Sequence, residues 1–289
     1  MSASVKIALA QSKPALGNVA ANLAAHLAWV AEARQAGAQV IVFPELSLTG
    51  YYLQDLVHDV AMPATPEAPA LAALLAASAE IDIVCGFVER DARERLFIAS
   101  AWLSAGRIVH VHRKVYPVTY GMFDDARFVG AGQQVRAFDT RLGRVGLFVC
   151  EDGWHLPVPY LLWQDGADLL FWVNASPGRG LDEPGRLGSQ HWAETLVGAY
   201  AGLLTTPLVF VNRVGYEDGA SFWGGSMLAD ANGAIVARAP TFDEALTFIQ
   251  LDPAETRRAR ARLPLLRDER ADLTLRELTR ITRGGVSPA

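Results

Sequence analysis

Three residues capable of nucleophilic chemistry lie where apolar segments of this 289-residue chain end. Cys150 follows the apolar run Val145–Val149 and is itself followed by two acids, Glu151 and Asp152. A cysteine acts as a nucleophile through its thiolate, and neighbouring carboxylates oppose thiolate formation. Either Cys150 is therefore inert, or another residue supplies a compensating positive charge.

Two other apolar segments carry groups that would complete such a site. The segment "VIVFPELSLTGY" contains Glu45, and "RIVHVHRKVYP" contains Lys114. Catalytic groups in layered α/β proteins tend to lie beyond strand ends, so we expect these side chains to meet Cys150 there. Lys114 would then offset the acids and Glu45 would act as general base. Taken singly, each residue also fits a structural role, and a Cys–His pair using His110 or His112 stays open.

The apolar pattern predicts the elements that would position these groups. Buried strands alternate early with helices, and hairpins follow later, one of them turning around Ala105 and Gly106. This order favours a mixed sheet covered by helices, in layers, within one domain. Strands are expected at 5–10, 39–44, 81–89, 97–104, 107–114, 145–149, 169–173, 207–214, 224–230, 234–239 and 246–252. Helices are expected at 18–37, capped by Asn18 with Leu23, Leu27 and Val30 on one face, and at 70–78, 190–204 and much of 254–283.

Composition limits the class of protein. The chain is 51% hydrophobic and 20% charged, which is ample for a large core. Its net charge of −5 argues against a nucleic-acid partner, and we interpret the basic segment at 256–262 as a solvated helix face or a subunit contact. The two cysteines, Cys85 and Cys150, form no CxxC motif, so neither a disulfide scaffold nor a cysteine zinc site is expected. Without a signal-peptide pattern or a membrane-spanning run, we expect a soluble, cytoplasmic protein.

Three segments together resemble one family. "FPELSLTGY", "HRKVYPVTYGMFDDARFVGAG" and "GLFVCEDGWHLP" are similar, in that order, to the Glu, Lys and Cys segments of the nitrilase superfamily of carbon–nitrogen hydrolases. The resemblance covers essentially the whole chain. It implies a four-layer α-β-β-α sandwich, a single domain over 1–289, and a Glu45-Lys114-Cys150 triad without metal or organic cofactor. It also implies a homodimer or higher homo-oligomer, with a C-terminal extension at about 254–289 used in subunit contacts.

The resemblance further implies a mechanism. Glu45 takes the thiol proton, and Cys150 attacks an amide or nitrile carbon. Ammonia or an amine leaves, and water then releases the acid from a thioester. Lys114 and the backbone N–H of Glu151 would hold the oxyanion, so the acids after Cys150 matter less as charges.

Within the superfamily, the chain is most similar to the glutaminase domains of glutamine-dependent NAD synthetases, with informative departures. It contains no SGGxDS-like nucleotide loop. Asp125 stands where those domains have a glutamate eleven positions after the catalytic lysine. Those domains also use a basic residue six positions after the serine that corresponds to Ser176, whereas this chain has Asp182. Either Arg179 or Arg186 could substitute from the same Gly-rich loop.

Four residues are expected to contact the substrate. Tyr120 and Phe123 match aromatic positions that line the pocket of that family, although core packing is an equal alternative. Asn174 and Ser176 follow the buried strand expected at 169–173.

Three functions remain in consideration. We favour an amidase that acts on a small-molecule amide other than glutamine, because Asp182 would repel a substrate carboxylate. The alternative is a glutaminase subunit that supplies ammonia to a separate NAD synthetase-type enzyme. A non-catalytic protein on the same scaffold is disfavoured by the intact Glu45, Lys114 and Cys150 set.

Overall fold

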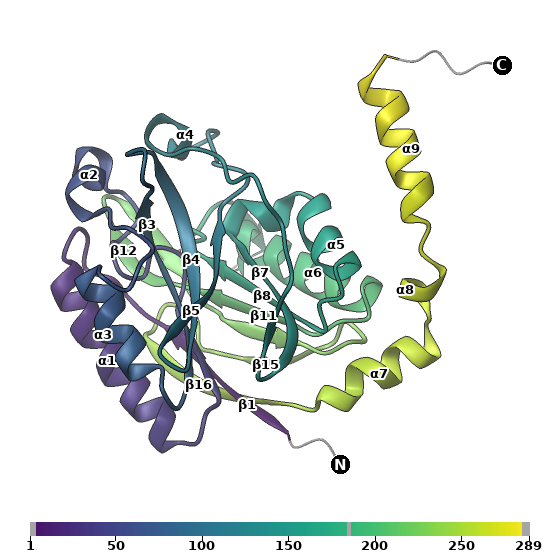
Figure 1. Ribbon diagram of the computed structural model, residues 1–289, viewed down its shortest axis with the longest axis horizontal. Helices are drawn as coiled ribbons and strands as arrows, with labels where there is room; N and C mark the ends of the chain where they lie inside the picture. The colour runs from purple at the N-terminus through teal and green to yellow at the C-terminus, as the bar shows by residue number, and fades with distance from the viewer. Residues whose placement is uncertain (1–3, 184–185, 285–289) are drawn as a thin grey trace.

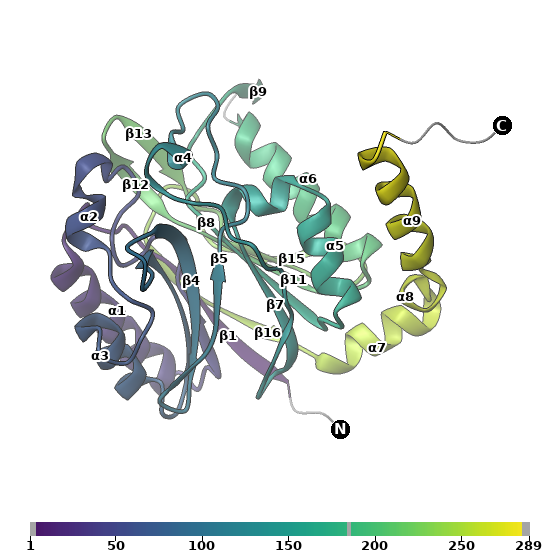
Figure 2. The ribbon, with the colours of Figure 1, turned by 45° about the horizontal axis from the view of Figure 1, so that its top comes forward.

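Two six-stranded sheets face each other, and helices cover the outer surface of each sheet (Figures 1 and 2). The computed structural model describes residues 4–183 and 186–284. The resulting four layers run helix, sheet, sheet, helix, and this confirms the α-β-β-α sandwich predicted from the sequence.

Each sheet mixes parallel and antiparallel neighbours. In spatial order, the first sheet contains β16 (Ala245–Leu251), β1 (Val5–Gln11), β2 (Val40–Val42), β3 (Asp82–Arg90), β4 (Leu96–Ser104) and β5 (Arg107–Arg113). The second contains β15 (Ile235–Arg238), β14 (Met227–Ala229), β11 (Leu208–Asn212), β8 (Leu169–Asn174), β7 (Gly143–Val149) and β6 (Phe138–Thr140). Two short hairpins, β9 (Leu181–Glu183) with β10 (Arg186–Leu187) and β12 (Val214–Glu217) with β13 (Ala220–Trp223), stand apart from the sheets.

The helices divide between the two outer layers. Helices α1 (Val19–Gln35) and α3 (Pro69–Ala77) pack on the first sheet, and α5 (Pro157–Gln164) and α6 (Gly188–Leu203) pack on the second. Short helices occupy loops: η1 (Gln54–Leu56), α2 (Val57–Val60), α4 (Asp125–Phe128) and η2 (Cys150–Trp154). The chain continues through α7 (Pro253–Arg262), α8 (Leu265–Asp268) and α9 (Ala271–Thr282).

Apolar side chains fill all three interfaces between the layers. The central cluster includes Leu9 and Val42 from the first sheet and Val149, Phe171 and Val211 from the second, all fully buried. Strands with both faces covered are expected to be continuously apolar, as β2 is throughout and as β7 and β8 are over Val145–Val149 and Leu169–Val173. The parallel strands β7, β8 and β11 end on the same edge of the second sheet, which is where polar residues begin.

Helix α1 differs from its predicted orientation. Asn18 caps it as expected, accepting a hydrogen bond from the Ala21 N–H at 3.1 Å. The buried face, however, centres on Asn22, His26, Val30 and Ala33, while the predicted leucines are only partly buried. His26 tolerates burial because its ring nitrogens are bonded to the Asn22 carbonyl and the Ser47 hydroxyl, at 2.7 and 2.9 Å.

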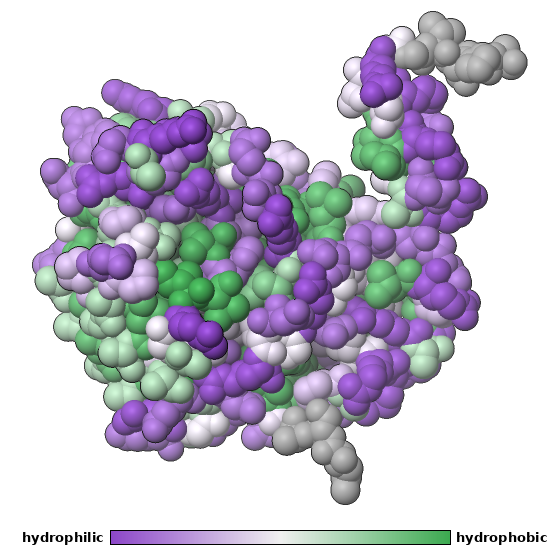
Figure 3. All heavy atoms as spheres, viewed as in Figure 1, coloured by the Kyte–Doolittle hydropathy of each residue, from purple (hydrophilic) through white to green (hydrophobic). Residues whose placement is uncertain are grey.

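The C-terminal helices leave the body of the molecule (Figure 1). Helix α7 is anchored by Ala259, which is 3% exposed, and by a 2.5 Å ion pair from Arg260 to Asp168. Helix α9 projects away, and Leu275, Leu278 and Ile281 are 69%, 55% and 61% exposed. In the view of Figure 3, apolar atoms lie on the side of α9 that faces the body. Across the described residues, no helix combines the length and apolar character needed to cross a membrane.

Candidate active site

Cys150 occupies a sharp turn at the end of β7. Its φ is +47°, a left-handed conformation that non-glycine residues rarely adopt, and such strain concentrates at functional sites. Trp172 holds the turn by donating a 2.8 Å hydrogen bond to the Cys150 carbonyl. Gly153 lets this indole approach, because a Cβ there would lie 2.3 Å from the Trp172 ring. The turn is therefore fixed by the core beneath it.

Lys114 lies between two carboxylates. Its Nζ donates to Glu45 Oε1 at 2.9 Å and to Asp125 Oδ2 at 2.7 Å, and the side chains of all three are at most 6% exposed. The second Glu45 oxygen accepts the Ala175 N–H at 2.8 Å, and the Glu45 carboxylate is near enough to the Cys150 thiol to raise its pKa. The structure thus brings together Glu45, Lys114 and Cys150, with Asp125 as a fourth member.

Electrostatics define the resting state of this cluster. Burial would lower the pKa of Lys114, but Asp125 and Glu45 raise it well above its ordinary value, so the ammonium stays charged. Burial, with Glu45 nearby, raises the pKa of the Cys150 thiol, and Lys114 only partly opposes this. Burial also raises the pKa of Glu45. A neutral thiol beside a carboxylate of raised basicity is suited to proton transfer as attack occurs.

The two acids that follow Cys150 point to different partners. Asp152, fully buried, accepts the N–H groups of Val115 and Tyr116 at 2.8 and 3.0 Å, and its other oxygen pairs with His112 at 2.8 Å. It thereby ties the segment after Lys114 to the turn that carries Cys150. This engagement also removes His112 from the alternative Cys–His pair. His110 stacks on Phe138 instead, with ring centroids 4.2 Å apart.

Glu151 faces the cavity and not the cluster. Tyr120 donates to both of its carboxylate oxygens, at 3.1 and 3.2 Å. Burial and the charge of Glu151 raise the pKa of Tyr120 to about 12, which keeps the phenol protonated as the donor. The Glu151 side chain thus lines the cavity while Tyr120 bonds to it, and its Oε1 also lies 3.6 Å from His155 Nε2.

A cavity of about 430 Å³ opens over Cys150. This volume is within the range of small-molecule sites. Its lining includes three of the predicted substrate contacts, together with aromatic and glycine residues of the 176–192 segment. The lining residues are Tyr120, Phe123, Cys150, Glu151, Trp154, Ser176, Pro177, Arg179, Gly180, Gly188, Ser189 and Trp192.

The fourth predicted contact lies elsewhere. Asn174 is 1% exposed, its amide donates to the Trp172 carbonyl at 2.9 Å, and it is absent from the described cavity lining. As the last residue of β8, it is held within the sheet layer. Ser176, two residues later, reaches the cavity, where its hydroxyl accepts the Trp223 indole N–H at 3.3 Å.

Of the two arginines in the Gly-rich loop, one lines the cavity and the other does not. Arg179 lines the cavity, with its guanidinium carbon 5.8 and 5.4 Å from the ring centroids of Tyr120 and Phe123. Arg186 turns to Glu194, at 2.6 Å. The backbone of Asp182 belongs to β9, but its side chain lies outside the described residues.

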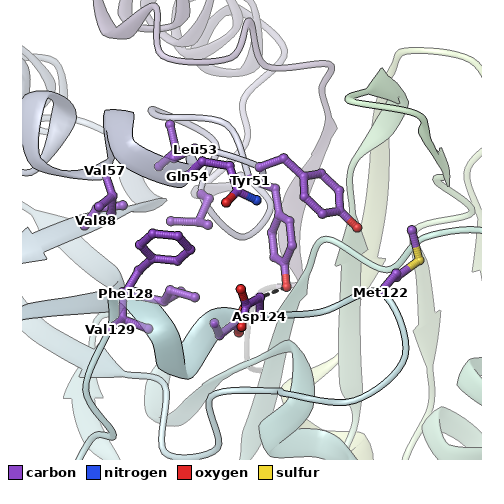
Figure 4. Close-up of a pocket in the computed structure, with 13 residues that line it drawn as sticks. Tyr51, Leu53, Gln54, Val57, Val88, Met122, Asp124, Phe128 and Val129 are labelled. Atoms are coloured by element: carbon purple, nitrogen blue, oxygen red, sulfur yellow. Dashed lines mark hydrogen bonds between the residues drawn. The ribbon is translucent and has the colours of Figure 1, made fainter.

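A second, smaller pocket of about 60 Å³ adjoins Tyr51 and Asp125 (Figure 4). Leu53, Val57 and Phe128 give it an apolar wall. The dashed line in Figure 4 marks the 2.8 Å hydrogen bond from the Tyr51 hydroxyl to Asp125 Oδ1. Sequence reasoning missed Tyr51, although it ends the quoted glutamate segment, because its type and position alone do not indicate that it contacts Asp125.

Metal ligands do not gather at the site. Within 4–183 and 186–284, no group of three or more His, Cys, Asp or Glu side chains could hold a metal ion. The charged cluster is instead internally paired, and its chemistry is that of a thiol, a carboxylate and an ammonium.

The fold and this cluster define a class of protein that comparison with known proteins identifies. The family model for carbon-nitrogen hydrolases matches residues 6–261. The chain therefore belongs to the carbon–nitrogen hydrolase family, as the resemblance in its sequence implied, and it is a carbon–nitrogen hydrolase enzyme.

Individual relatives fall into two groups. The chain is 30% identical over 254 residues to a glutamine-dependent NAD(+) synthetase of Acinetobacter baylyi, a match that covers 88% of this chain and 45% of that protein. It thus spans less than half the length of that relative. It is 28% identical over 270 residues to N-carbamoylputrescine amidase of Arabidopsis thaliana, covering 89% of each. A carbon-nitrogen hydrolase of Helicobacter pylori shares the fold, with a TM-score of 0.85, 22% identity, and coverage of 96% and 99%.

Proposed function

We propose that the protein hydrolyses the C–N bond of a small amide through a thioester on Cys150, releasing ammonia or an amine. The observation that carries this proposal is the buried Lys114–Glu45 ion pair next to Cys150, which lines a cavity of small-molecule size. Residues elsewhere in the cavity would bind the remainder of the substrate.

Each step has a group in place. Glu45, held by Lys114 and the Ala175 N–H, accepts the thiol proton as sulfur attacks the amide carbon. Lys114 and the backbone N–H of Glu151 stabilise the negative charge that develops on the amide oxygen, and losing one such donor typically costs about 10²–10³ in rate. Glu45 then protonates the leaving amine and activates the water that hydrolyses the thioester. Asp125 keeps the ammonium of Lys114 in position throughout.

Ammonia release from a panel of amides, carbamoyl compounds and nitriles tests this proposal, with Cys150→Ala as the matched control. We expect turnover of at least one amide by the wild-type protein and none by the variant, at equal folded fraction. Comparable ammonia release from a well-folded Cys150→Ala protein would exclude the thioester mechanism.

A glutaminase is the second candidate, and Arg179 favours it. Glutamine carries an α-carboxylate and an α-ammonium. The cavity offers a guanidinium at Arg179 and a carboxylate at Glu151, which are complementary in charge to these groups. The relative of Acinetobacter baylyi, named as glutamine-dependent, adds support. A glutaminase subunit would show glutamine hydrolysis that increases when a separate NAD synthetase-type enzyme is added.

We also propose that α9 contacts a second copy of this chain. Its leucine and isoleucine side chains are exposed on one face of an amphipathic helix that projects from the body. Light scattering of the wild-type protein and a Leu275→Asp, Leu278→Asp variant tests this contact. A homo-oligomer that survives both substitutions unchanged would place the subunit interface elsewhere.

A further inference from the structure

A buried ion pair lies beside the cluster without belonging to it. Arg213 Nη1 donates to Glu217 Oε2 at 2.7 Å, and the two side chains are only 1% and 3% exposed. The other oxygen of Glu217 accepts the backbone N–H groups of Tyr51 and Tyr52, both at 2.7 Å. One carboxylate therefore fastens the loop that follows Glu45 to the β12–β13 hairpin.

A continuous path of hydrogen bonds leads from this carboxylate to the lysine. The backbone of Tyr51 is held by Glu217, and the Tyr51 hydroxyl donates to Asp125 Oδ1 at 2.8 Å. The other Asp125 oxygen accepts from Lys114 at 2.7 Å, and Lys114 donates to Glu45 at 2.9 Å. The Tyr51 hydroxyl is the one described hydrogen-bond donor to Asp125 Oδ1, whereas Oδ2 also accepts the Val118 N–H at 3.3 Å. Loss of the hydroxyl would therefore leave Oδ1 without a described donor.

Stability alone explains this ion pair poorly. Burying two charges costs about as much as their attraction returns, and apolar replacements are often as stable. Two further donors of Arg213, Nε and Nη2, have no hydrogen-bond partner among the described residues. The Glu217 carboxylate accepts two adjacent backbone N–H groups of the Tyr51–Tyr52 segment with one oxygen while the other oxygen accepts from Arg213.

We propose that Glu217, held by Arg213, is a positioning residue that fixes Tyr51 so that its hydroxyl keeps Asp125 against Lys114. This inference rests on the proposed function, since it concerns the lysine of the proposed reaction. It predicts that Tyr51 and Glu217 act in series, so that losing either has the consequence of losing both.

Three variants test the path: Tyr51→Phe, Glu217→Ala and the double variant. The first keeps the aromatic ring and removes only the hydroxyl. Glu217→Met replaces Glu217→Ala if the latter does not fold, because methionine keeps the side-chain length but offers no oxygen to the two backbone N–H groups. Asp82→Asn is the matched control, because Asp82 is fully buried and paired with Arg141 but begins β3, at the opposite end of the strands from Glu45.

We expect each single variant to lower kcat by roughly tenfold to a hundredfold with KM within about twofold, as for loss of one charged hydrogen bond. The double variant should fall no further than about twofold below the lower single variant, because coupled sites are not additive. The Asp82→Asn control should keep kcat within about twofold of wild type. Independent effects of Tyr51 and Glu217 that multiply in the double variant, or an equal loss in the control, would overturn the proposal.

A second measurement needs no turnover. The rate of Cys150 alkylation by iodoacetamide should fall about tenfold in Tyr51→Phe and Glu217→Ala, because a displaced ammonium stabilises the thiolate less. Unchanged alkylation in both variants would contradict the path. Wild-type protein that hydrolyses no compound of the panel would overturn the proposed function instead, and alkylation would still decide the role of Glu217.

Discussion

Replacing Arg179 by methionine is expected to change which substrates the enzyme accepts while leaving its chemistry intact. Arg179 lines the cavity over Cys150, and no acid pairs with its guanidinium among the described residues. Its guanidinium carbon lies 5.8 and 5.4 Å from the ring centroids of Tyr120 and Phe123. Methionine keeps comparable length and apolar contact with both rings and removes only the positive charge.

The expected magnitude follows from the exposure of this side chain. A hydrogen bond to a charged group contributes about 1.5–3 kcal/mol, and solvent screening at an exposed site favours the lower end. About 1.5 kcal/mol corresponds to roughly a tenfold change in kcat/KM. For Arg179→Met we therefore expect kcat/KM for glutamine to fall about tenfold, and that for butanamide to stay within about twofold.

Steady-state ammonia release with both amides is the assay, and Arg186→Met is the control. Arg186 lies in the same loop but pairs with Glu194, so its loss should leave the ratio of the two kcat/KM values unchanged. Asp182→Lys is expected to raise activity on glutamine relative to butanamide, as charge repulsion by Asp182 predicts. An equal loss on both substrates in Arg179→Met, or the same shift of ratio in Arg186→Met, would refute a role of Arg179 in reading a carboxylate.

Three other predictions concern ionisation. Iodoacetamide should label Cys150 and leave Cys85 unlabelled in the folded protein by mass spectrometry, because Cys150 lines the cavity and Cys85 is fully buried within β3. Preferential labelling of Cys85 would contradict this. Burial raises the pKa of Glu45. Activity measured as kcat/KM should therefore be lost, as the base becomes protonated, at a pH above the ordinary glutamate pKa of about 4.3. Loss of activity only at or below pH 4 would show that Glu45 is not the base. Burial lowers the pKa of His26 from 6.5 to about 4, so its contribution to stability is complete above pH 6.5 and is lost as the pH falls toward 4. The free energy of unfolding measured with urea should decrease by an amount on the order of 3 kcal/mol between pH 6.5 and pH 4. In His26→Asn this decrease should be smaller.

Much of the site follows from where apolar strands end. Cys150 directly follows β7 and Lys114 directly follows β5, so the apolar segments that precede them sufficed to place both at strand ends. Glu45 lies three residues beyond β2, which is shorter than predicted because only Val40–Val42 pair with neighbouring strands. Phe43 and Pro44, which follow the strand, are also buried. An apolar pattern alone therefore does not distinguish a buried strand residue from a buried residue in the loop after it.

The remaining features depend on contacts distant in sequence. Nothing local indicates that Asp152 bonds to the segment after Lys114, because its partners are backbone N–H groups 36 and 37 positions away. Arg179 was one of two basic candidates, since glycines leave the path of its loop undetermined by sequence. Asn174 was expected in the cavity from its position at a strand end, but its amide bonds within the strand.

Glu45, Lys114 and Cys150 come together from opposite halves of the sandwich, and this has a consequence for folding. Glu45 and Lys114 belong to the first sheet, Cys150 to the second, and 69 residues separate Glu45 from Lys114. Contacts between such remote segments form late, because each requires closure of a long chain loop. Recovery of activity during refolding should therefore coincide with docking of the two sheets. Enzymatic turnover would then report this last step of folding, and an intermediate with undocked sheets would be inactive.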